Sequence, residues 1–551
     1  MFRKLCFVMA IALLPFSFVW AQEGTWGQIT GNFQADGQYY IADSIIGASS
    51  PAEKTMLNSF ANFTYNLGNF SAGFRYEGYL NTLLGYPNQG GINDGIGIPY
   101  RWANFVNDKF EITVGNFYEQ FGNGLVLRTY EEKQLGIDNA LDGIRVKISP
   151  YKGIYLKGLV GKQRLYWEKG EGIVRGFDGD FMVNEIVPEW NEKPWNLGFG
   201  GSFVSKYQAD EDPVYALPQN VGAGAGRLLF SVAGLSINSE YAYKINDPSS
   251  DNGYIFRPGQ AFLVNASYSR SGLGILVATK WIDNMSFRSD RNAISTNLNI
   301  NQLPEITKAH TYSLTAFYPY ATQPNGEWGV QADVIYKFKK NTKIGGKYGT
   351  SIALNFSRVQ NTAQTPVNDS TPIGSHGTYG YNTNFFSIGD SLYFQDINFE
   401  LSKKWSSKFK TIFTYQNIIY NYNVLRGTRG HETVFAHCGI ADISYNFTDN
   451  ISLHTELQAL FTKQDKGNWG MLLLEFTIPH WFFTISDNWN YGNSDASHRT
   501  HYLLAGFGYN NGGNRIQLSY GKQREGITCV GGVCRAVPAS NGIIISISST
   551  F

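Results

Sequence analysis

The sequence has no excess of either charge, few cysteines and, after its first 21 residues, no long apolar run. Its 551 residues include 45 lysines and arginines, 44 aspartates and glutamates, and four cysteines. A charge this balanced argues against nucleic acid as a partner, because nucleic-acid binding depends on a basic surface. A transmembrane helix needs about 20 consecutive apolar residues. No stretch beyond the start of the chain provides them, which excludes a helical membrane protein.

The start of the chain has the features of a secretory signal peptide. Arg3 and Lys4 precede an apolar run over residues 5–20, and Ala21 is a small residue at the expected cleavage position before Gln22. Residues 1–21 are therefore expected to be removed, together with Cys6. We expect residues 22–551 to form the mature protein, without a lipid-anchored N-terminus because no cysteine follows the cleavage site.

Aromatic residues and glycine are abundant. Aromatic residues make up 15% of the chain and there are 60 glycines, while the hydrophobic content of 43% is ordinary. A secreted chain of this composition is either a large extracellular β protein or a membrane β-barrel.

Alternation along the chain distinguishes these two classes. From Trp328 to Phe338 the even positions are apolar throughout, whereas Gln331, Asp333 and Lys337 occupy odd positions. Successive strand residues face opposite sides, so such a strand has one apolar and one polar face. The pattern recurs in many segments of about ten residues with aromatic residues near their ends, which favours a transmembrane barrel over a soluble sandwich.

The connections between these segments fall into two groups, as in outer-membrane barrels with short periplasmic turns and long outer loops. Counting the segments predicts an all-β, antiparallel transmembrane barrel of roughly 24 strands, within a range of about 18 to 26. We expect residues 22–551 to form this one domain, without a plug domain, in the cell outer membrane. The short turns lie at 66–69, 149–152, 447–450 and 511–514, and the long loops at 41–53, 84–97, 121–137, 288–308 and 359–388.

The C-terminal segment resembles the terminal strand signal of Gram-negative outer-membrane barrels. Ile543, Ile545, Ile547 and Phe551 form an alternating apolar set that ends on an aromatic residue. The resemblance implies that these side chains face lipid and that the barrel-assembly machinery reads them. Ser549 departs from the pattern, because a bulky apolar residue is usual at that position. A chance edge strand in a soluble β protein is the alternative.

Two cysteines lie just before this last strand, in a loop with two glycines. If the strand runs inward from the cell surface, Cys529 and Cys534 lie outside the cell, where disulfides persist. We therefore predict a disulfide between them. A CxxxxC pair supplies only two metal ligands and no histidine accompanies it, so a metal site is the weaker alternative. Cys438 shares its strand face with polar residues and is expected to be a buried or lumen-facing free thiol.

The run "NALDGIRVKISPYKGIYLKG" at 139–158 resembles the strand–turn–strand hairpin of general porins. In porins the preceding loop folds into the lumen, where its acids face basic wall residues. The resemblance implies that Glu131 and Glu132 are loop acids and that Arg145 and Lys147 line the pore. Charged strand residues solvated in a wide lumen are the alternative.

The composition and the loop "CVGGVCRAVP" resemble poorly characterised outer-membrane barrel families of Bacteroidota. No nucleotide, metal or nucleophile motif appears, and the group Asp495, Ser497, His498 and His501 is a weak candidate for catalysis. We predict no enzyme, cofactor or metal. The prediction is a passive, porin-like channel for small hydrophilic solutes. The alternative is a scaffold in a secretion or surface-display complex that binds other outer-membrane or surface proteins.

Overall fold

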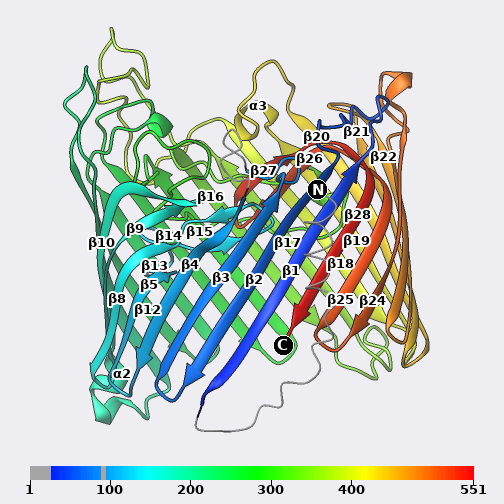
Figure 1. Ribbon diagram of the computed structural model, residues 1–551, viewed down its shortest axis with the longest axis horizontal. Helices are drawn as coiled ribbons and strands as arrows, with labels where there is room; N and C mark the ends of the chain where they lie inside the picture. Colours follow the sequence, from blue (N-terminus) through cyan, green and yellow to red (C-terminus); the bar gives the residue numbers. More distant parts are fainter. Residues whose placement is uncertain (1–25, 88–94) are drawn as a thin grey trace.

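A computed structural model describes residues 26–87 and 95–551 of the chain, so the predicted signal peptide lies outside the described residues. The fold is one antiparallel sheet of 24 strands. Its first strand, β1, pairs with its last, β28, and this pairing closes the sheet into a barrel (Figure 1). The predicted fold class and the predicted strand number are therefore confirmed, and no plug domain occurs within the described residues.

The barrel strands follow one another around the ring in chain order, and two short hairpins, β6–β7 and β26–β27, lie outside the ring. The strands are β1 (Gln28–Tyr40), β2 (Thr55–Leu67), β3 (Phe70–Leu80), β4 (Gly95–Val106), β5 (Phe110–Phe117), β6 (Glu131–Glu132), β7 (Ile137–Asp138), β8 (Leu141–Tyr151), β9 (Ile154–Leu165), β10 (Glu168–Met182), β11 (Trp195–Tyr207), β12 (Asn220–Val232), β13 (Leu235–Lys244), β14 (Gly259–Arg270), β15 (Leu273–Asp283), β16 (Gly326–Lys337), β17 (Thr350–Gln360), β18 (Leu392–Lys404), β19 (Phe409–Tyr420), β20 (Val434–Thr448), β21 (Ile451–Thr462), β22 (Trp469–Ile478), β23 (Trp481–Trp489), β24 (His501–Asn511), β25 (Asn514–Gln523), β26 (Gly526–Val530), β27 (Val533–Val537) and β28 (Ser540–Thr550).

Helices within the described residues are few and short. They are α2 (Val183–Ile186), α3 (Tyr422–Leu425) and the 3₁₀ turns Pro188–Trp190, Ser250–Asn252, Thr315–Phe317 and Ala496–His498. None of the helices among the described residues is long and apolar enough to cross a membrane.

The two ends of the barrel differ in their connections (Figure 1). At one end, the turn end, neighbouring strands are joined by short turns such as 449–450; β1 begins and β28 ends there. At the other, the loop end, the connections include residues 284–325 and 361–391. Because outer-membrane barrels carry their long loops on the extracellular side, the loop end is the extracellular end.

The outer wall is apolar because alternate residues of each strand face away from the lumen. On β25 the outward side chains of Ile516, Leu518 and Tyr520 are exposed, whereas Gln517 and Ser519 face the lumen. The register of β28 places the predicted outward residues beside the exposed set of β25, with Ile543, Ile545 and Ile547 opposite Tyr520, Leu518 and Ile516.

Phe551 ends the chain on the outer wall at the turn end. Its backbone bonds to Gly31 in both directions, with N–O distances of 2.8 and 3.0 Å. Its ring packs 5.9 Å from that of Phe63, which stacks on Phe74. Gly31 gives this ring room, because a side chain there would collide with it. Reading of this strand by the assembly machinery stays a prediction.

Candidate functional site

Residues 284–325, here called the crossing segment, connect β15 to β16 by running across the lumen. The carbonyl oxygen of Asn299 accepts a hydrogen bond of 2.7 Å from Gln163 on β9. The backbone N–H of Leu314 donates one of 2.9 Å to Gln458 on β21. β9 is the seventh strand of the closed ring and β21 the nineteenth, so they lie opposite each other in a ring of 24. The crossing segment therefore joins opposite walls.

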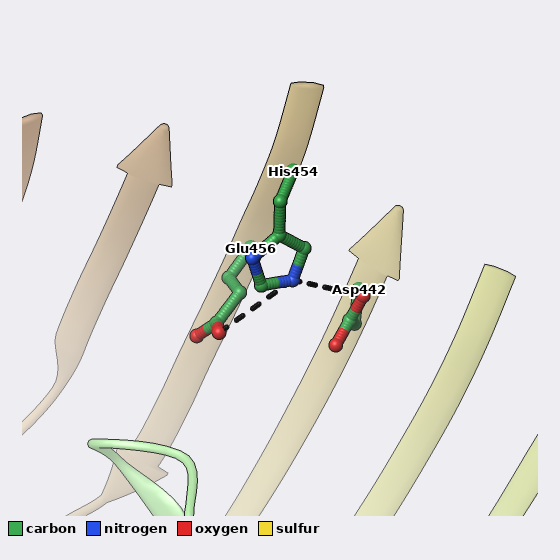
Figure 2. Close-up of side chains that lie close together, drawn as sticks. All are labelled: Asp442, His454 and Glu456. Carbon is green, nitrogen blue, oxygen red and sulfur yellow. Dashed lines mark ion pairs between the residues drawn. The ribbon is translucent and has the colours of Figure 1, made fainter. Parts of the chain in front are cut away.

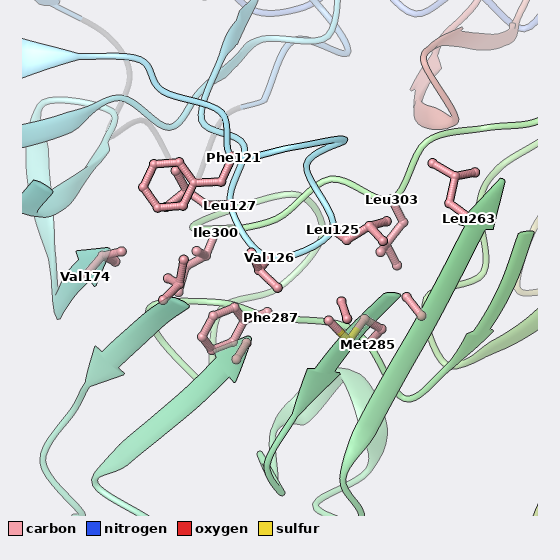
Figure 3. Packing of buried hydrophobic residues seen from close by; sticks show 14 of the residues in the cluster. Phe121, Leu125, Val126, Leu127, Val174, Leu263, Met285, Phe287, Ile300 and Leu303 are labelled. Carbon is pink, nitrogen blue, oxygen red and sulfur yellow. The ribbon is translucent and has the colours of Figure 1, made fainter. Parts of the chain in front are cut away.

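The first half of the crossing segment, residues 284–306, packs into an apolar core with the loop at 118–140, here called the inner loop (Figure 3). Phe287 and Ile300 are completely buried, and Phe121 of the inner loop joins the same cluster. The wall contributes small or branched residues from β9 to β15, such as Val174 and Ala261. Burial of this kind is the main stabilising contribution available to a loop without regular hydrogen bonding.

The second half, residues 307–325, packs against the opposite wall through aromatic side chains. Phe317 lies against Trp469 at a ring distance of 5.0 Å, and Tyr318 lies 5.4 Å from Tyr420. Cys438 of β20 belongs to this cluster and is fully buried, which agrees with the prediction of a buried free thiol. Its place among aromatic and aliphatic neighbours indicates a packing role.

Carboxylates of two wall strands and of the connection between β21 and β22 hold the second half by hydrogen bonds. His310 places a ring nitrogen 2.5 Å from Asp396. Tyr312 donates to Asp442 at 2.9 Å and Tyr318 donates to Asp465 at 3.1 Å. Burial, and then the neighbouring carboxylate, raises the pKa of Tyr318 above its usual range, so the hydroxyl stays protonated and keeps donating.

The contact at Asp442 belongs to a small charged cluster with His454 and Glu456 (Figure 2). The Nε2 atom of His454 lies 3.1 Å from Asp442 and 3.8 Å from Glu456. These three residue types can ligate metals. Both carboxylates, however, already accept hydrogen bonds from protein donors, Asp442 from Tyr312 and Glu456 from Gln458. The arrangement is therefore accounted for as an ion-paired anchor for the crossing segment.

The predicted pore-lining bases lie on the lumen wall, but a different loop acid meets them. Arg145 on β8 contacts Glu111 at 2.5 Å and Glu119 at 3.4 Å, and Lys147 lies 3.4 Å from Glu119. Lys157 on β9 approaches the same carboxylate at 3.2 Å. Burial alone would raise the pKa of Glu119, but these cations outweigh it and hold the pKa below its usual range.

Glu131 and Glu132, the predicted partners of those bases, lie elsewhere. Glu131 is 2.8 Å from Arg75 on β3, and Glu132 accepts a hydrogen bond from the backbone of Gln134. The expectation that these two acids face Arg145 and Lys147 is therefore wrong, because Glu119 is the loop acid that meets both bases. Both belong to the short β6–β7 hairpin, which turns the end of the inner loop toward β3, whereas Glu119 precedes it and reaches the wall at β8.

The disulfide hairpin lies on the crossing segment. Cys529 and Cys534 pair across β26 and β27 and are joined by a disulfide. Gly531 and Gly532 form the two-residue turn, and both have the positive φ that a tight hairpin requires. The carbonyls of these glycines accept hydrogen bonds from Gln302 at 3.1 Å and from the backbone of Thr322 at 3.0 Å. The hairpin therefore contacts both halves of the crossing segment.

The weak catalytic candidate is not an organised triad. Asp495 caps the 3₁₀ turn that carries Ser497 and His498, and it contacts the His498 ring at 2.9 Å. Both side chains are exposed at the loop end. His501 turns away to pair with Asp487 at 2.6 Å and stacks on Trp489. The hydrogen bonds within the turn account for the arrangement.

A closed antiparallel barrel with an apolar outer wall and a polar lumen is the form in which β proteins cross the bacterial outer membrane. The protein is an outer-membrane β-barrel.

The crossing segment was not predicted from the sequence. The feature that could have indicated it is the aromatic run from Tyr312 to Tyr320, which lies within a connection too long for a simple turn.

Several solved structures are similar to the chain. The translocation pore of the P pilus usher PapC has 9% identity and a TM-score of 0.44, over 95% of this chain and 99% of that one. The siderophore receptor PirA from Pseudomonas aeruginosa has 10% identity and a TM-score of 0.40, over 96% and 81%. OccAB3 from Acinetobacter baumannii has 9% identity and a TM-score of 0.35, over 95% and 99%.

None of the curated proteins matches the chain. The family described as "Family of unknown function (DUF6029)" matches residues 1–551, and the chain belongs to that family.

Proposed function

We propose that the barrel is a restricted channel for small hydrophilic solutes, whose free cross-section is set by the crossing segment. The observation that carries this proposal is the attachment of that segment to opposite walls of a lumen that remains polar beneath it. Below the aromatic core, the wall presents Glu456 and His454, and β8 and β9 present Lys147 and Lys157. A polar lining of this kind favours hydrated solutes over lipid.

The restriction distinguishes this proposal from a wide diffusion pore. Apolar cores occupy both ends of the crossing segment, and displacing it would expose side chains such as Phe287 and Trp469 to water. A solute must therefore pass beside the segment. We expect small solutes to cross and larger ones to be excluded.

Single-channel recording in planar bilayers tests the proposal. The native protein should give small, stable steps, and a variant in which residues 286–322 are replaced by a short Gly–Ser linker should give much larger ones. Heat-modifiable migration on gels confirms that both barrels are folded. A silent native protein beside a conducting linker variant would contradict the channel and would identify a barrel closed by its own chain.

A scaffold is the second candidate, and the connection 361–391 favours it. Phe385 from this connection packs on Trp281 at a ring distance of 5.1 Å and on Phe262 at 5.9 Å, so the chain covers part of the outer wall. Phe385 and Tyr379 nevertheless remain about half exposed. Exposed aromatic residues of this kind are typical of protein-binding surfaces. Loss of a stably co-purifying protein when residues 364–386 are shortened would support the scaffold.

A further inference from the structure

Two cavities flank the disulfide hairpin at the loop end of the lumen. One has a volume of about 470 Å³ and the other about 350 Å³. Arg426 and Ala536 line both, so the cavities adjoin. The larger is also lined by Phe317, Tyr422, Trp469, Tyr502 and Arg524, and the smaller by Tyr130, Arg288, Gln302, Thr322 and Arg535.

Arg524 in the larger cavity is a cation without a carboxylate partner among the described residues. Its guanidinium donates to the backbone carbonyls of Ser313 and Glu525, at 3.5 and 3.2 Å. It also lies 3.8 Å from the ring centre of Phe317. The carboxylate of Glu525 is paired with Lys466 instead. Burial lowers the pKa of Arg524 to about 10, so the group is still charged at neutral pH, and Asp465 of the same cavity lies beyond ion-pair distance.

Arg426 and Arg535 also contact uncharged groups rather than a carboxylate. Arg426 donates to the Tyr420 hydroxyl at 3.2 Å and lies over the Tyr422 ring. Arg535 donates to the carbonyl of Gln134 at 2.8 Å. Neither has a carboxylate within ion-pair distance in the part of the chain that the structure describes.

The other acids that line the cavities are engaged with other groups, and two buried arginines elsewhere in the lumen are paired. Asp465 accepts from Tyr318, and Asp251 pairs with Arg288 at 3.2 Å. By contrast, buried Arg75 and Arg227 of the barrel wall each contact two or more carboxylates. Three arginines without a carboxylate partner among the described residues, Arg426, Arg524 and Arg535, therefore line these two adjoining cavities.

Uncharged polar groups of the cavity walls also lack partners. Among the described residues, the indole Nε1 of Trp469, Oγ1 of Thr322 and Oε1 of Gln302 are buried without a hydrogen bond. Buried polar groups are nearly always satisfied in folded proteins, by protein, water or ligand. Donors and acceptors left open beside unpaired cations are the features of a polar binding site.

We propose that the two cavities form a binding site for a small anionic ligand, in which a carboxylate, sulfate or phosphate ester is attached to a ring. Arginine fits such groups because its fork of N–H donors bonds two oxygens at once. Tyr422 and Tyr502 supply aromatic surface against which a ring packs. An acidic saccharide has this chemistry, whether it is free in solution or part of lipopolysaccharide. The site does not depend on whether the barrel conducts.

Isothermal titration of the purified, folded barrel tests the site with trigalacturonate and with its fully methyl-esterified form, in which each carboxylate is replaced by an uncharged methyl ester. We expect the acid to bind at least about tenfold more tightly than the ester, since charge-assisted hydrogen bonds are lost with the carboxylates. The double change Arg426→Gln and Arg524→Gln should weaken binding of the acid by a similar factor. Arg499→Gln, at the same rim but outside both cavities, is the matched control and should bind as the native protein does.

The two sources of the ligand are separated by competition. Displacement of trigalacturonate by lipopolysaccharide micelles would identify the ligand as lipopolysaccharide of the outer leaflet. Binding of trigalacturonate without such displacement would identify it as a free solute. If the double variant does not fold, Arg524→Gln alone serves in its place. Equal affinity for acid and ester, unchanged affinity in the arginine variants, or no binding of either trigalacturonate or lipopolysaccharide would overturn the proposal.

Discussion

The two halves of the crossing segment are held in the lumen by different interactions. The first half is held by aliphatic and aromatic burial between the inner loop and the wall, with Phe287 and Ile300 fully buried. The second half combines aromatic packing with hydrogen bonds to wall carboxylates, such as Tyr312 to Asp442. The first half also takes part in hydrogen bonds, such as the one from Gln163 to the carbonyl of Asn299, but this one reaches its backbone. Burial and backbone contacts therefore hold the first half, whereas the hydrogen bonds of the second half also fix the positions of its side chains.

Phe287→Ala should have the largest effect, because it removes a fully buried ring from the first half. Substitutions of this kind cost about 3–5 kcal/mol, and the loss should appear as faster amide exchange over residues 284–306. Phe461→Ala is the control, since Phe461 is half exposed on the outer wall. Equal protection in both variants would show that the first half is not held by its core.

Removing two hydroxyls from the second half should have a smaller effect. In Tyr312→Phe with Tyr318→Phe, the rings remain while Asp442 and Asp465 each lose a donor. Each loss should cost about 1–3 kcal/mol, measured by amide exchange over residues 310–320. Tyr415→Phe, whose hydroxyl bonds His437 on the exposed wall, is the matched control. A loss of protection confined to the first half would contradict the division between the two.

Acidification should release the inner loop before it affects the core of the first half. The pKa of Glu119 is below its ordinary value of 4.5 because Lys157, Lys147 and Arg145 surround it. An acid with a lowered pKa stabilises the fold above its unfolded pKa, and this stabilisation is lost as pH falls through its folded pKa. Protease cleavage within residues 118–140 should therefore increase below about pH 4.5 in the native protein. Glu119→Gln should remove most of this pH dependence, and an unchanged profile would count against the ion pairs.

Breaking the disulfide should change the crossing segment least. The ring closed by Cys529 and Cys534 is short, so its entropic contribution is at most about 2–3 kcal/mol, and it acts on the hairpin. In the variant with both cysteines replaced by serine, we expect a normal heat-modifiable barrel and native protection of the crossing segment. Impermeant thiol reagents should label neither cysteine of the native protein on intact cells until reductant is added. Labelling without reductant would refute the disulfide.

The barrel wall could be predicted from sequence because the alternation of apolar and polar residues along a strand is a local pattern. Every second residue from Trp328 to Phe338 is apolar, and this stretch overlaps β16 almost completely. The same rule places Arg145 and Lys147 on the inner face of β8. No comparable rule governs the crossing segment, whose apolar residues follow no fixed period because they fill spaces that distant strands leave. Residues 288–308 were therefore expected to form a polar outer loop, although Ile300 and Leu303 are buried in the lumen.

The acid that meets Arg145 shows the same limit at a single residue. Glu119, Glu131 and Glu132 are all loop acids near β8 in the sequence, and composition does not distinguish them. The path of the inner loop determines which acid meets Arg145, because the β6–β7 hairpin directs Glu131 to Arg75 instead. The unpaired arginines of the hairpin cavities were not predicted either, since the absence of a partner is a property of the assembled structure.

The attachment of the crossing segment to opposite walls has a mechanical consequence. A closed sheet resists stretching along its hydrogen bonds, but a wide cylinder of 24 strands can flatten without breaking any of them. The chain between Asn299 and Leu314 acts as a tie across the diameter, fixed to β9 at one end and to β21 at the other. Lateral pressure from the bilayer that would lengthen the section along the line from β9 to β21 must therefore load this tie, so the barrel resists deformation in that direction more than its wall alone would.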